Sequence, residues 1–386
     1  MSGSQLRELR SIDELRAVAE PWDDLWQRSD LRLPTMQCDM LAQWLEQFAP
    51  RSRLRILIVE QDGRLVAALP LVQARFRGLV NAGSAPGNPW SVAGDLALDT
   101  GGDLDGALDA LAGGLDAAGW PLLCFETINP ESRRWSRFEQ ALTRRGLACV
   151  VRKRFEIGRV AVEGTWEKYQ AFWSRNHRRA IKRALAKAEG DGTVELAVYD
   201  RPRPDEIERL LREGFGVEDR SWKGREGSSV MRTPGMLEFF IGQGRLLAAR
   251  NQLQLVLLRH NGSPIAFEYG WSSKGTYFSP KVGFDEAFHQ YAPGQLLRAR
   301  LFERFFREKS HEEVDFLGPI VDATAKWSTS SYPIASMIVA PRRLKSRLLL
   351  GGYRTLSDWK EKVKKWKAAR AARAKPAEGA TADTED

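Results

Sequence analysis

The sequence is poor in the residues that build cross-linked or metal-bound domains. The 386-residue chain has three cysteines, Cys38, Cys124 and Cys149, and no two of them have C-x-x-C spacing. Neither a disulfide framework nor a zinc knuckle is therefore supported. The four histidines lie far apart and form no pair with metal-ligand spacing. We expect a protein without a metal cofactor.

Long apolar runs are missing as well. No run of 18 apolar residues occurs, and the first ten residues are polar, without the apolar stretch of a signal peptide. These absences predict a cytoplasmic protein without a membrane span. Hydrophobic residues nevertheless make up 43% of the chain, with 13 Trp and 17 Phe, which is enough for a large core. The length favours two domains with an appendage.

Positive charge is concentrated near the C-terminus. The whole chain has a formal net charge of +9. Residues 341–375 contain 13 Lys and Arg against Asp358 and Glu361, whereas residues 376–386 contain four acids and no base. The remainder of the chain is almost neutral, so the high isoelectric point does not indicate a body that binds nucleic acid.

One arrangement of a helix and two strands occurs twice. Residues 40–71 have the pattern of an apolar helix, a strand, an Asp-Gly turn and a second strand, and residues 236–270 repeat it around an Asn-Gly turn. Both dipeptides are strong hairpin signals between strand-like runs. The repetition predicts two related domains of mixed α/β structure packed together. Chance similarity between two hairpins is the alternative.

One loop has the pattern of an anion-binding site. A strand predicted over 275–286 is followed by Pro293-Gly294 and then at once by a helix. We expect free backbone N–H groups at Gly294, Gln295, Leu296 and Leu297, at the positive end of the helix, where a phosphate is stabilised. A plain turn with Pro at the first helical position explains the same residues.

A second anion-binding candidate is the helix predicted over 174–190. It has six Lys or Arg, among them Arg178 and Arg179, before its first acid, Glu189. The segment is either a platform for an anionic ligand or a solvated helix face. A purely solvated face normally mixes Glu among its basic residues, and here Glu is missing.

Other polar residues are candidates for a substrate cleft. Trp222 and Lys223 lie in a glycine-rich loop, and Asp285 follows a predicted strand, where catalytic bases often lie. Asp315 ends a short strand, and Lys326 follows it. The structural alternatives are a packed tryptophan, a turn capped by Asp285 and an Asp315–Lys326 ion pair.

These motifs, taken in order, resemble a known family. The segments are W-S-R-N-H-R-R-A-I-K-R, S-W-K-G-R-E-G, the Asn-Gly hairpin, V-G-F-D-E-A-F-H-Q-Y-A-P-G-Q-L-L, D-F-L-G and A-K-W. Their order resembles that of the GNAT-like acetyltransferases of the BioF2-like and CelD (cellulose biosynthesis) group, which are similar to the FemAB transferases. The resemblance covers roughly residues 20–330 and is strongest over 165–327. It implies two tandem GNAT domains of mixed α/β fold and an acyl-CoA donor.

The resemblance also implies roles for particular residues. The pyrophosphate loop corresponds to Tyr291, Ala292, Pro293, Gly294, Gln295, Leu296 and Leu297. Ala292 replaces the usual serine, which removes one hydroxyl near the phosphates. Asp285 is our first candidate for the general base, and Tyr291 or Tyr332 for the acid that protonates the departing thiolate. The candidates for substrate binding are Arg178, Arg179, Trp222, Lys223, Lys281, Asp315 and Lys326.

The sequence-based hypothesis is an acyltransferase that uses acetyl-CoA or another acyl-CoA and acts on an amine or a hydroxyl group, in cell-envelope or exopolysaccharide biosynthesis. The acceptor is not identified. One alternative is a FemAB-like transferase that uses aminoacyl-tRNA, held by the basic helix. Another is a non-catalytic scaffold of a polysaccharide-synthesis assembly.

We expect three parts in the chain: a non-catalytic GNAT-like domain over 1–153, the acyltransferase domain over 154–340 and a basic tail over 341–386. In the tail, Trp359, Val363 and Trp366 fall on one helical face. Such a basic amphipathic helix suits an anionic membrane surface, which would make the protein peripheral at the inner face of the membrane. Docking of both tryptophans on the protein's own body is the alternative. The acidic end, 376–386, is expected to be disordered.

Overall fold

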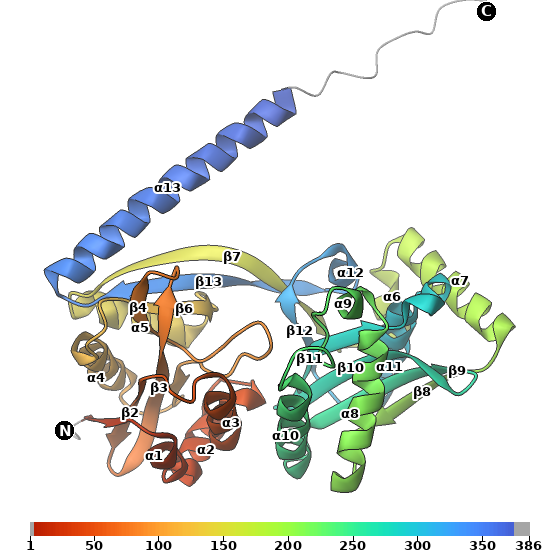
Figure 1. The fold of residues 1–386 in the computed structure, drawn as a ribbon, viewed down its shortest axis with the longest axis horizontal. Helices are drawn as coiled ribbons and strands as arrows, with labels where there is room; N and C mark the ends of the chain where they lie inside the picture. The colour runs from red at the N-terminus through yellow and green to blue at the C-terminus, as the bar shows by residue number, and fades with distance from the viewer. Residues whose placement is uncertain (1–3, 374–386) are drawn as a thin grey trace, which may run out of the picture.

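The computed structural model describes residues 4–373. The acidic end, for which disorder is predicted, lies outside the described residues. One mixed β-sheet runs through both halves of the molecule, in the strand order β1-β2-β3-β4-β6-β13-β7-β12-β11-β10-β9-β8, with β5 paired to β3. Figure 1 shows the helices packed around this sheet and one long helix that leaves the body near the C-terminus.

Each half contributes strands to the sheet, and two long strands, β7 and β13, lie between the halves. The first half contains β1 (Gln5–Leu9), β2 (Leu54–Gln61), β3 (Arg64–Phe76), β4 (Val80–Ser84), β5 (Ala97–Leu98), β6 (Leu123–Ile128) and β7 (Ala148–Ala161). The second half contains β8 (Val194–Tyr199), β9 (Leu253–His260), β10 (Ser263–Ser273), β11 (Thr276–Phe284), β12 (Glu313–Pro319) and β13 (Ser330–Ala340).

Helices cover both faces of the sheet. The first half has α1 (Ile12–Arg16), α2 (Ala19–Arg28), η1 (Pro34–Met36), α3 (Cys38–Phe48), α4 (Leu104–Ala117) and α5 (Arg133–Arg144). The second half has α6 (Trp166–Ala171), α7 (Arg175–Asp191), α8 (Pro204–Asp219), α9 (Trp222–Arg225), α10 (Met236–Ala249), η2 (Glu286–Tyr291), α11 (Pro293–Glu308) and α12 (Asp322–Ala325). The chain ends in α13 (Leu344–Arg373).

The predicted internal repeat is confirmed. Strands β1-β2-β3-β4-β6 of the first half have the same order as β8-β9-β10-β11-β12 of the second. In each half the last two of these strands are parallel. Both predicted hairpin turns form, with Asp62-Gly63 and Asn261-Gly262 in left-handed backbone conformations (φ 49–79°) that suit the right-handed twist of the strands.

The two halves exchange strands and do not meet at a linker. β7 pairs with β13 along its whole length, from Ser330 opposite Arg159 to Ala340 opposite Ala148. The predicted boundary at residue 153 falls in the middle of β7, and β13 of the predicted second domain also pairs with β6 of the first. The charged residues 152–156 belong to β7. They are only partly covered by the rest of the molecule. Both strands cross between the halves in Figure 1.

A shared apolar core reinforces this link. The repeated helices α3 and α10 pack against each other, with the rings of Phe48 and Phe239 4.9 Å apart. Gln43 of α3 donates a hydrogen bond to the Phe239 carbonyl (2.9 Å). One continuous cluster of buried side chains therefore includes α3 of the first half and Phe240 of α10 in the second.

The shared core predicts a single unfolding transition. Phe240 is fully buried among Phe215, Phe239 and Tyr269. Phe240→Ala should lower the free energy of unfolding by about 3–5 kcal/mol, because it leaves a cavity that the core cannot close. Urea unfolding followed by tryptophan fluorescence measures this. Phe172→Ala is the matched control, with an exposed ring, and should change stability by less than about 0.5 kcal/mol. Two separate transitions, only one of them shifted by Phe240→Ala, would contradict the shared core.

Candidate functional site

The parallel strands β11 and β12 pair for only three residues and then separate. Thr276 lies opposite Glu313 and Phe278 opposite Asp315, and no further pair follows. Beyond Phe278, β11 continues beside β10, and β12 remains beside β7. The pairing of β11 with β10 is irregular between the pairs Trp271–Phe278 and Tyr269–Lys281. One edge of β11 therefore faces an open wedge. Among the described residues its backbone groups there pair with no strand, and the Val282 carbonyl accepts a hydrogen bond from the Lys223 ammonium (3.3 Å).

The wedge opens onto a cavity between the two halves. The cavity has a volume of about 330 Å³. Phe278 and Asp315, which mark the start of the wedge, lie in its wall. The first half and β7 contribute polar side chains, among them Asp30, Arg32, Asp95, Asn129, Arg134 and Arg159. A cavity of this size and mixed polarity suits a small polar ligand.

Asp315 is the most buried carboxylate of the cavity wall, with 4% of its surface exposed. It accepts hydrogen bonds from the Tyr332 hydroxyl and from the Leu317 N–H, both at 2.8 Å. The Arg159 guanidinium lies 3.6 Å away and stacks on the Tyr332 ring. Burial raises the pKa of Asp315 to about 6. The group is therefore mostly ionised near neutral pH but more basic than an ordinary aspartate, as a general base requires.

Leu317 has a left-handed backbone conformation, with φ 55°. This conformation costs a β-strand leucine of the order of 1 kcal/mol. It lets the Leu317 N–H turn back to the Asp315 carboxylate. Backbone strain at this point therefore accompanies the fixed orientation of Asp315.

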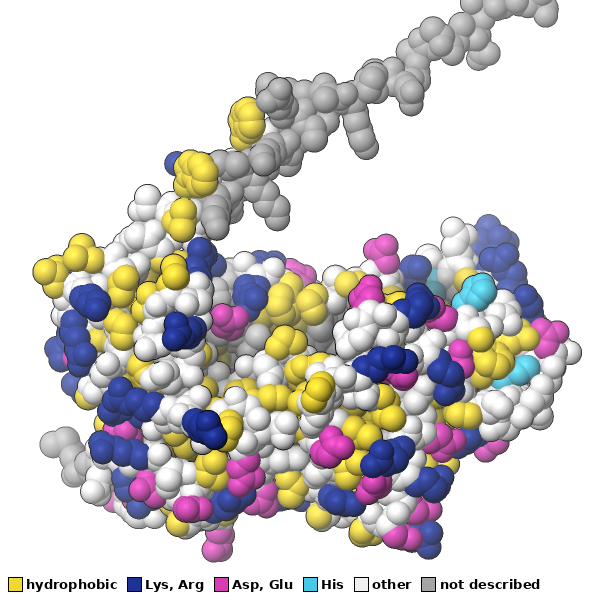
Figure 2. Space-filling view, in the orientation of Figure 1, with side chains coloured by type: hydrophobic (Ala, Val, Ile, Leu, Met, Phe, Trp, Pro, Cys, Tyr) yellow, Lys and Arg dark blue, Asp and Glu magenta, His cyan; other side chains and the backbone are white. Residues whose placement is uncertain are grey.

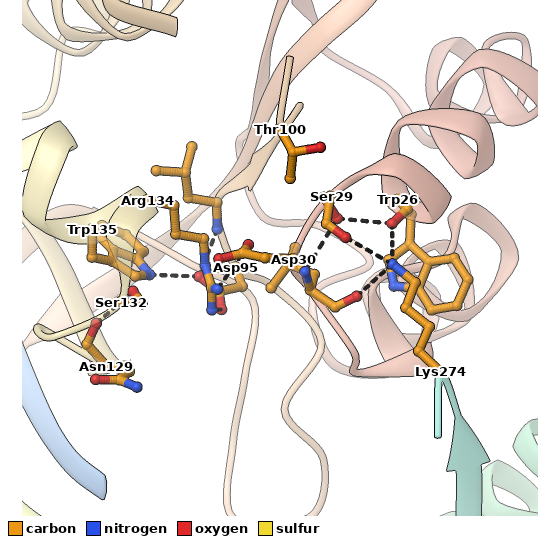
Figure 3. A network of polar contacts seen from close by, with 12 residues as sticks. Trp26, Ser29, Asp30, Asp95, Thr100, Asn129, Ser132, Arg134, Trp135 and Lys274 are labelled. Carbon is orange, nitrogen blue, oxygen red and sulfur yellow. Dashed lines mark hydrogen bonds and ion pairs between the residues drawn. The ribbon is translucent and has the colours of Figure 1, made fainter. Parts of the chain in front are cut away.

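The first half supplies the opposite wall of the cavity through Arg134. Its guanidinium bonds to Asp95 at 2.7 Å and to Asp30 at 3.0 Å, and the Trp135 indole N–H donates to Asp95 at 2.7 Å. Figure 3 shows this network, with Asn129 and Ser132 beside it. These residues carry no recognisable motif, since they lie in loops or at a helix start, and sequence analysis missed them.

Lys274 of the second half holds the first-half wall of the cavity in place. Its ammonium donates to the carbonyls of Trp26 (2.5 Å), Ser29 (3.0 Å) and Leu31 (2.7 Å) in the first half. Figure 3 shows these three bonds. Burial lowers the pKa of Lys274 to about 8. The turn between β10 and β11 is thus bound to the chain segment that leads into the cavity wall.

The predicted anion loop forms, but with fewer free amides than expected. Ala292 has a left-handed conformation (φ 48°), so that α11 starts directly after η2. The N–H groups of Gln295 and Leu296 both donate to the Ala292 carbonyl, at 2.9 and 3.1 Å, and the prediction that they are free was wrong. Within residues 4–373 the Gly294 N–H donates no hydrogen bond. A Cβ built on Gly294 would have its nearest neighbour, Phe284, at 3.6 Å, so the space beside it is open.

The candidate base Asp285 is occupied by structural contacts. It caps η2 by accepting from the Ala287 N–H (3.0 Å) and forms an ion pair with Arg220 (2.5 Å). It lies seven residues beyond Phe278, which is roughly 20 Å along an extended strand. The structural alternative for Asp285, a cap, is the arrangement found.

Tyr291 and Tyr332 lie in different places. Tyr291 donates to Asp191 at 2.7 Å and stacks on His260, so it fixes η2 to the end of α7. Tyr332 lies in the cavity beside Asp315. Of the two proposed acids, only Tyr332 lies near the cavity carboxylate.

The remaining substrate-binding candidates are spread over the second half. Lys223 bonds to Glu218 (2.7 Å), and Trp222 beside it is exposed. Lys281 packs against the ring of Trp90 from the first half (4.5 Å), and burial lowers its pKa to about 8. Lys326 is exposed and forms no ion pair with Asp315 among the described residues. Asp315 is therefore the one member of this group in the cavity.

The basic face of α7 is exposed next to the anion loop. Arg178 and Arg179 are exposed, and across the described part of the chain neither they nor the other four basic side chains before Glu189 pair with a carboxylate. Figure 2 shows dark-blue side chains gathered at the upper right, over α7. The Tyr291–Asp191 bond places the end of α7 beside the segment that leads into α11. Unpaired cations near a helix N-terminus favour an anionic ligand there.

No cluster of three His, Cys, Asp or Glu suited to a metal ion occurs between residues 4 and 373. The side chains of Asp315, Tyr332 and Arg159 and the backbone of β11 meet at the cavity. A base of raised pKa, a neighbouring hydroxyl and an unpaired strand edge at one cavity are suited to moving a proton while an oxyanion forms.

Comparisons with known proteins identify the family of the chain. The sequence matches the acetyltransferase (GNAT) domain family over residues 2–79 and 175–326, more than half of the chain. No curated protein matches the sequence significantly.

Solved structures of low sequence identity share the fold. A conserved protein of unknown function from Bacteroides thetaiotaomicron is 11% identical, with a TM-score of 0.55 over 89% of this chain and 100% of that one. FemX is 11% identical, with a TM-score of 0.56 over 86% and 96% of the two chains. The C-terminal domain of a protein named as a lysylphosphatidylglycerol synthetase, from Agrobacterium fabrum, is 14% identical, with a TM-score of 0.51 over 89% and 97%. The chain belongs to the acetyltransferase (GNAT) domain family and is a GNAT-type acyltransferase with two tandem GNAT-like domains.

Proposed function

We propose that the protein transfers an acyl group from acyl-CoA, preferably acetyl-CoA, to an amine bound in the cavity between the domains. One observation carries the proposal: the wedge between β11 and β12 opens at Phe278 and Asp315 onto that cavity. A donor in the wedge and an acceptor in the cavity would then meet at Asp315, a carboxylate of the cavity wall whose raised pKa suits a base.

The wedge has a suitable length for the donor. It runs along β11 from the Phe284 end, next to Gly294, to Phe278 at the cavity. This distance is roughly 20 Å of extended strand, comparable to the extended pantetheine arm of CoA. The unpaired backbone of β11 can bond to the amides of that arm as a neighbouring strand would. The Gly294 N–H and the positive end of α11 favour the pyrophosphate at the other end.

Asp315 replaces Asp285 as the proposed general base. Asp315 accepts the proton of the acceptor amine as the amine attacks the thioester carbonyl. Backbone N–H groups of β11 next to Phe278 stabilise the oxyanion. Tyr332 donates its proton to the departing sulfur and regains one from Asp315 through their hydrogen bond. Arg159 keeps both side chains in place.

The charges of the cavity favour an amine acceptor. Asp30, Asp95, Glu313 and Asp315 lie in its wall with Arg32, Arg134 and Arg159, so carboxylates outnumber guanidinium groups. The motif order supports a place in the BioF2-like and CelD group, and one structural neighbour has the name of a membrane-lipid enzyme. On this basis we place the acceptor in the cell envelope or in exopolysaccharide biosynthesis.

The first test replaces the proposed base. Asp315→Asn should lower kcat about 100-fold or more, because general base catalysis typically contributes this much. The assay measures CoA thiol release from acetyl-CoA with a panel of small amines and amino sugars. In the parent, kcat/KM should rise with pH through about 6, since the base acts only when it is ionised. This rise should be absent in Asp315→Asn.

Asp285→Asn is the matched control for that experiment. It removes a carboxylate that caps η2, and kcat should change less than threefold. The melting temperature of Asp315→Asn should equal or exceed that of the parent, because a buried carboxylate with a raised pKa opposes folding at neutral pH. A larger loss of kcat in Asp285→Asn than in Asp315→Asn would restore Asp285 as the base.

The second test addresses the donor loop. Gly294→Glu places a carboxylate where the pyrophosphate is proposed, and CoA affinity measured by calorimetry should fall at least about tenfold, or about 1.4 kcal/mol. Gly294→Ala is the control, since its Cβ meets only an ordinary contact with Phe284, and it should bind CoA like the parent. Unchanged affinity in a folded Gly294→Glu protein would show that the phosphates bind elsewhere.

The basic face of α7 favours a second candidate function, transfer from aminoacyl-tRNA. We expect the Arg178→Ala/Arg179→Ala variant to bind its anionic donor more weakly and with a smaller dependence on salt. Titrations of CoA and of bulk tRNA at two salt concentrations distinguish the donors. The control is Arg209→Ala/Arg212→Ala on α8, whose side chains are also exposed. Stability should change by less than about 0.5 kcal/mol. Tight tRNA binding without CoA binding would favour the tRNA function.

A further inference from the structure

An exposed apolar stripe runs along α13. At 100° per residue, Leu344, Leu348, Leu356, Trp359 and Trp366 lie within an arc of about 120°. All five side chains are exposed; 75% of the surface of Leu344 and 61% of that of Trp359 is accessible. The alternative that both tryptophans are buried against the protein's own body is therefore wrong.

The opposite face of α13 holds the helix on the body. Leu350 is buried in a small apolar cluster with Ala82, Cys124 and Ile338 of the sheet, and Ser346 is buried on the same side. Asp358 pairs with Arg152 of β7. The orientation of α13 is thus fixed by its packed face, and the stripe points away from the body. Figure 1 shows the rest of the helix extending away from the sheet.

The tip of the β3–β4 hairpin extends the apolar stripe. Leu79, at the tip, has 86% of its surface exposed. It lies in the wall of the same groove as Leu344, Leu348 and Leu356. Arg77 stacks on Tyr353 of α13, and Phe76 packs against the same ring at 5.5 Å, so the hairpin is held next to the helix. Two separate chain segments therefore present apolar side chains on one side of the molecule.

Basic residues lie beside this surface. Arg77 and Lys345 line the groove, and the exposed Arg343, Arg347 and Arg354 lie on other faces of the first turns of α13 or just before it. Arg342, also exposed, pairs with Asp116. Figure 2 shows yellow side chains at the upper left, where α13 leaves the body, with dark-blue side chains beside them. Within residues 4–373, no helix has the length and apolarity to cross a membrane.

We propose that the hairpin tip and the stripe of α13 together form a docking surface for an anionic lipid bilayer. Exposed Leu and Trp side chains would enter the boundary between headgroups and acyl chains, and the cations beside them would contact the headgroup phosphates. The positive charge favours a bilayer over a second copy of the chain, because two such surfaces would repel each other. This proposal does not depend on the acyl-transfer activity.

The test is sedimentation of the full-length protein with vesicles. Phosphatidylcholine vesicles with phosphatidylglycerol should bind the parent, pure phosphatidylcholine vesicles should bind it much more weakly, and added salt should weaken binding. Leu79→Ser and Trp359→Ser/Trp366→Ser should each weaken binding to the anionic vesicles at least about tenfold, because each removes apolar area from the contact. Phe172→Ser is the matched control, an exposed ring directly after α6, and should bind like the parent.

Three outcomes would overturn the proposal. A parent that does not sediment with anionic vesicles at low salt excludes the surface altogether. A normal affinity of Leu79→Ser excludes the joint role of the hairpin. Light scattering that detects a dimer broken by the same substitutions, without vesicle binding, identifies a second copy as the occupant. Because all the changed side chains are exposed, each variant should fold, and circular dichroism checks this.

Discussion

The antiparallel pairing of β7 with β13 is the interaction on which the rest of the molecule depends. It joins two sheets that would otherwise end in open edges, and so makes one sheet of both domains. It also builds the cavity. Arg159 of β7 lies opposite Asp315 of β12 on one side, and Ile157 lies opposite Tyr332 of β13 on the other. Asp315, the Tyr332 hydroxyl that donates to it and the Arg159 guanidinium beside them are therefore positioned by strand register.

Charge burial at the domain interface is offset by short polar contacts from the other half. Lys274 loses water but gains three carbonyl oxygens of the first domain. Lys281 of the second domain lies over the ring of Trp90 of the first. Both lysines would lose these contacts while still largely buried if the domains separated only slightly, which is unfavourable. The arrangement thus favours one fixed domain geometry, and with it a cavity of constant shape.

Local signals in the sequence predicted the hairpins, the repeat and the loop before α11, because turn residues and strand patterns act over a few neighbours. The strand exchange was not predictable in this way: the sequence analysis ended the first domain at residue 153, and only long-range pairing with β13 and β12 carries the strand beyond it. The site was predicted in part. Asp315 was among the candidates for substrate binding and Tyr332 among those for the acid. A position at the end of a strand made Asp285 the first candidate for the base. Arg134 and Asp95 lie in segments without a motif, and only the fold brings them to the cavity.

The position of β13 between β6 and β7 has a consequence for synthesis of the chain. The first domain lacks its central strand until residues 330–340 have left the ribosome, after nearly all of the second domain. Until then β6 and β7 each present an unpaired edge, the kind of surface through which nascent chains aggregate. The N-terminal domain therefore cannot complete its fold until nearly all of the second domain has been synthesised, and β13 inserts only then.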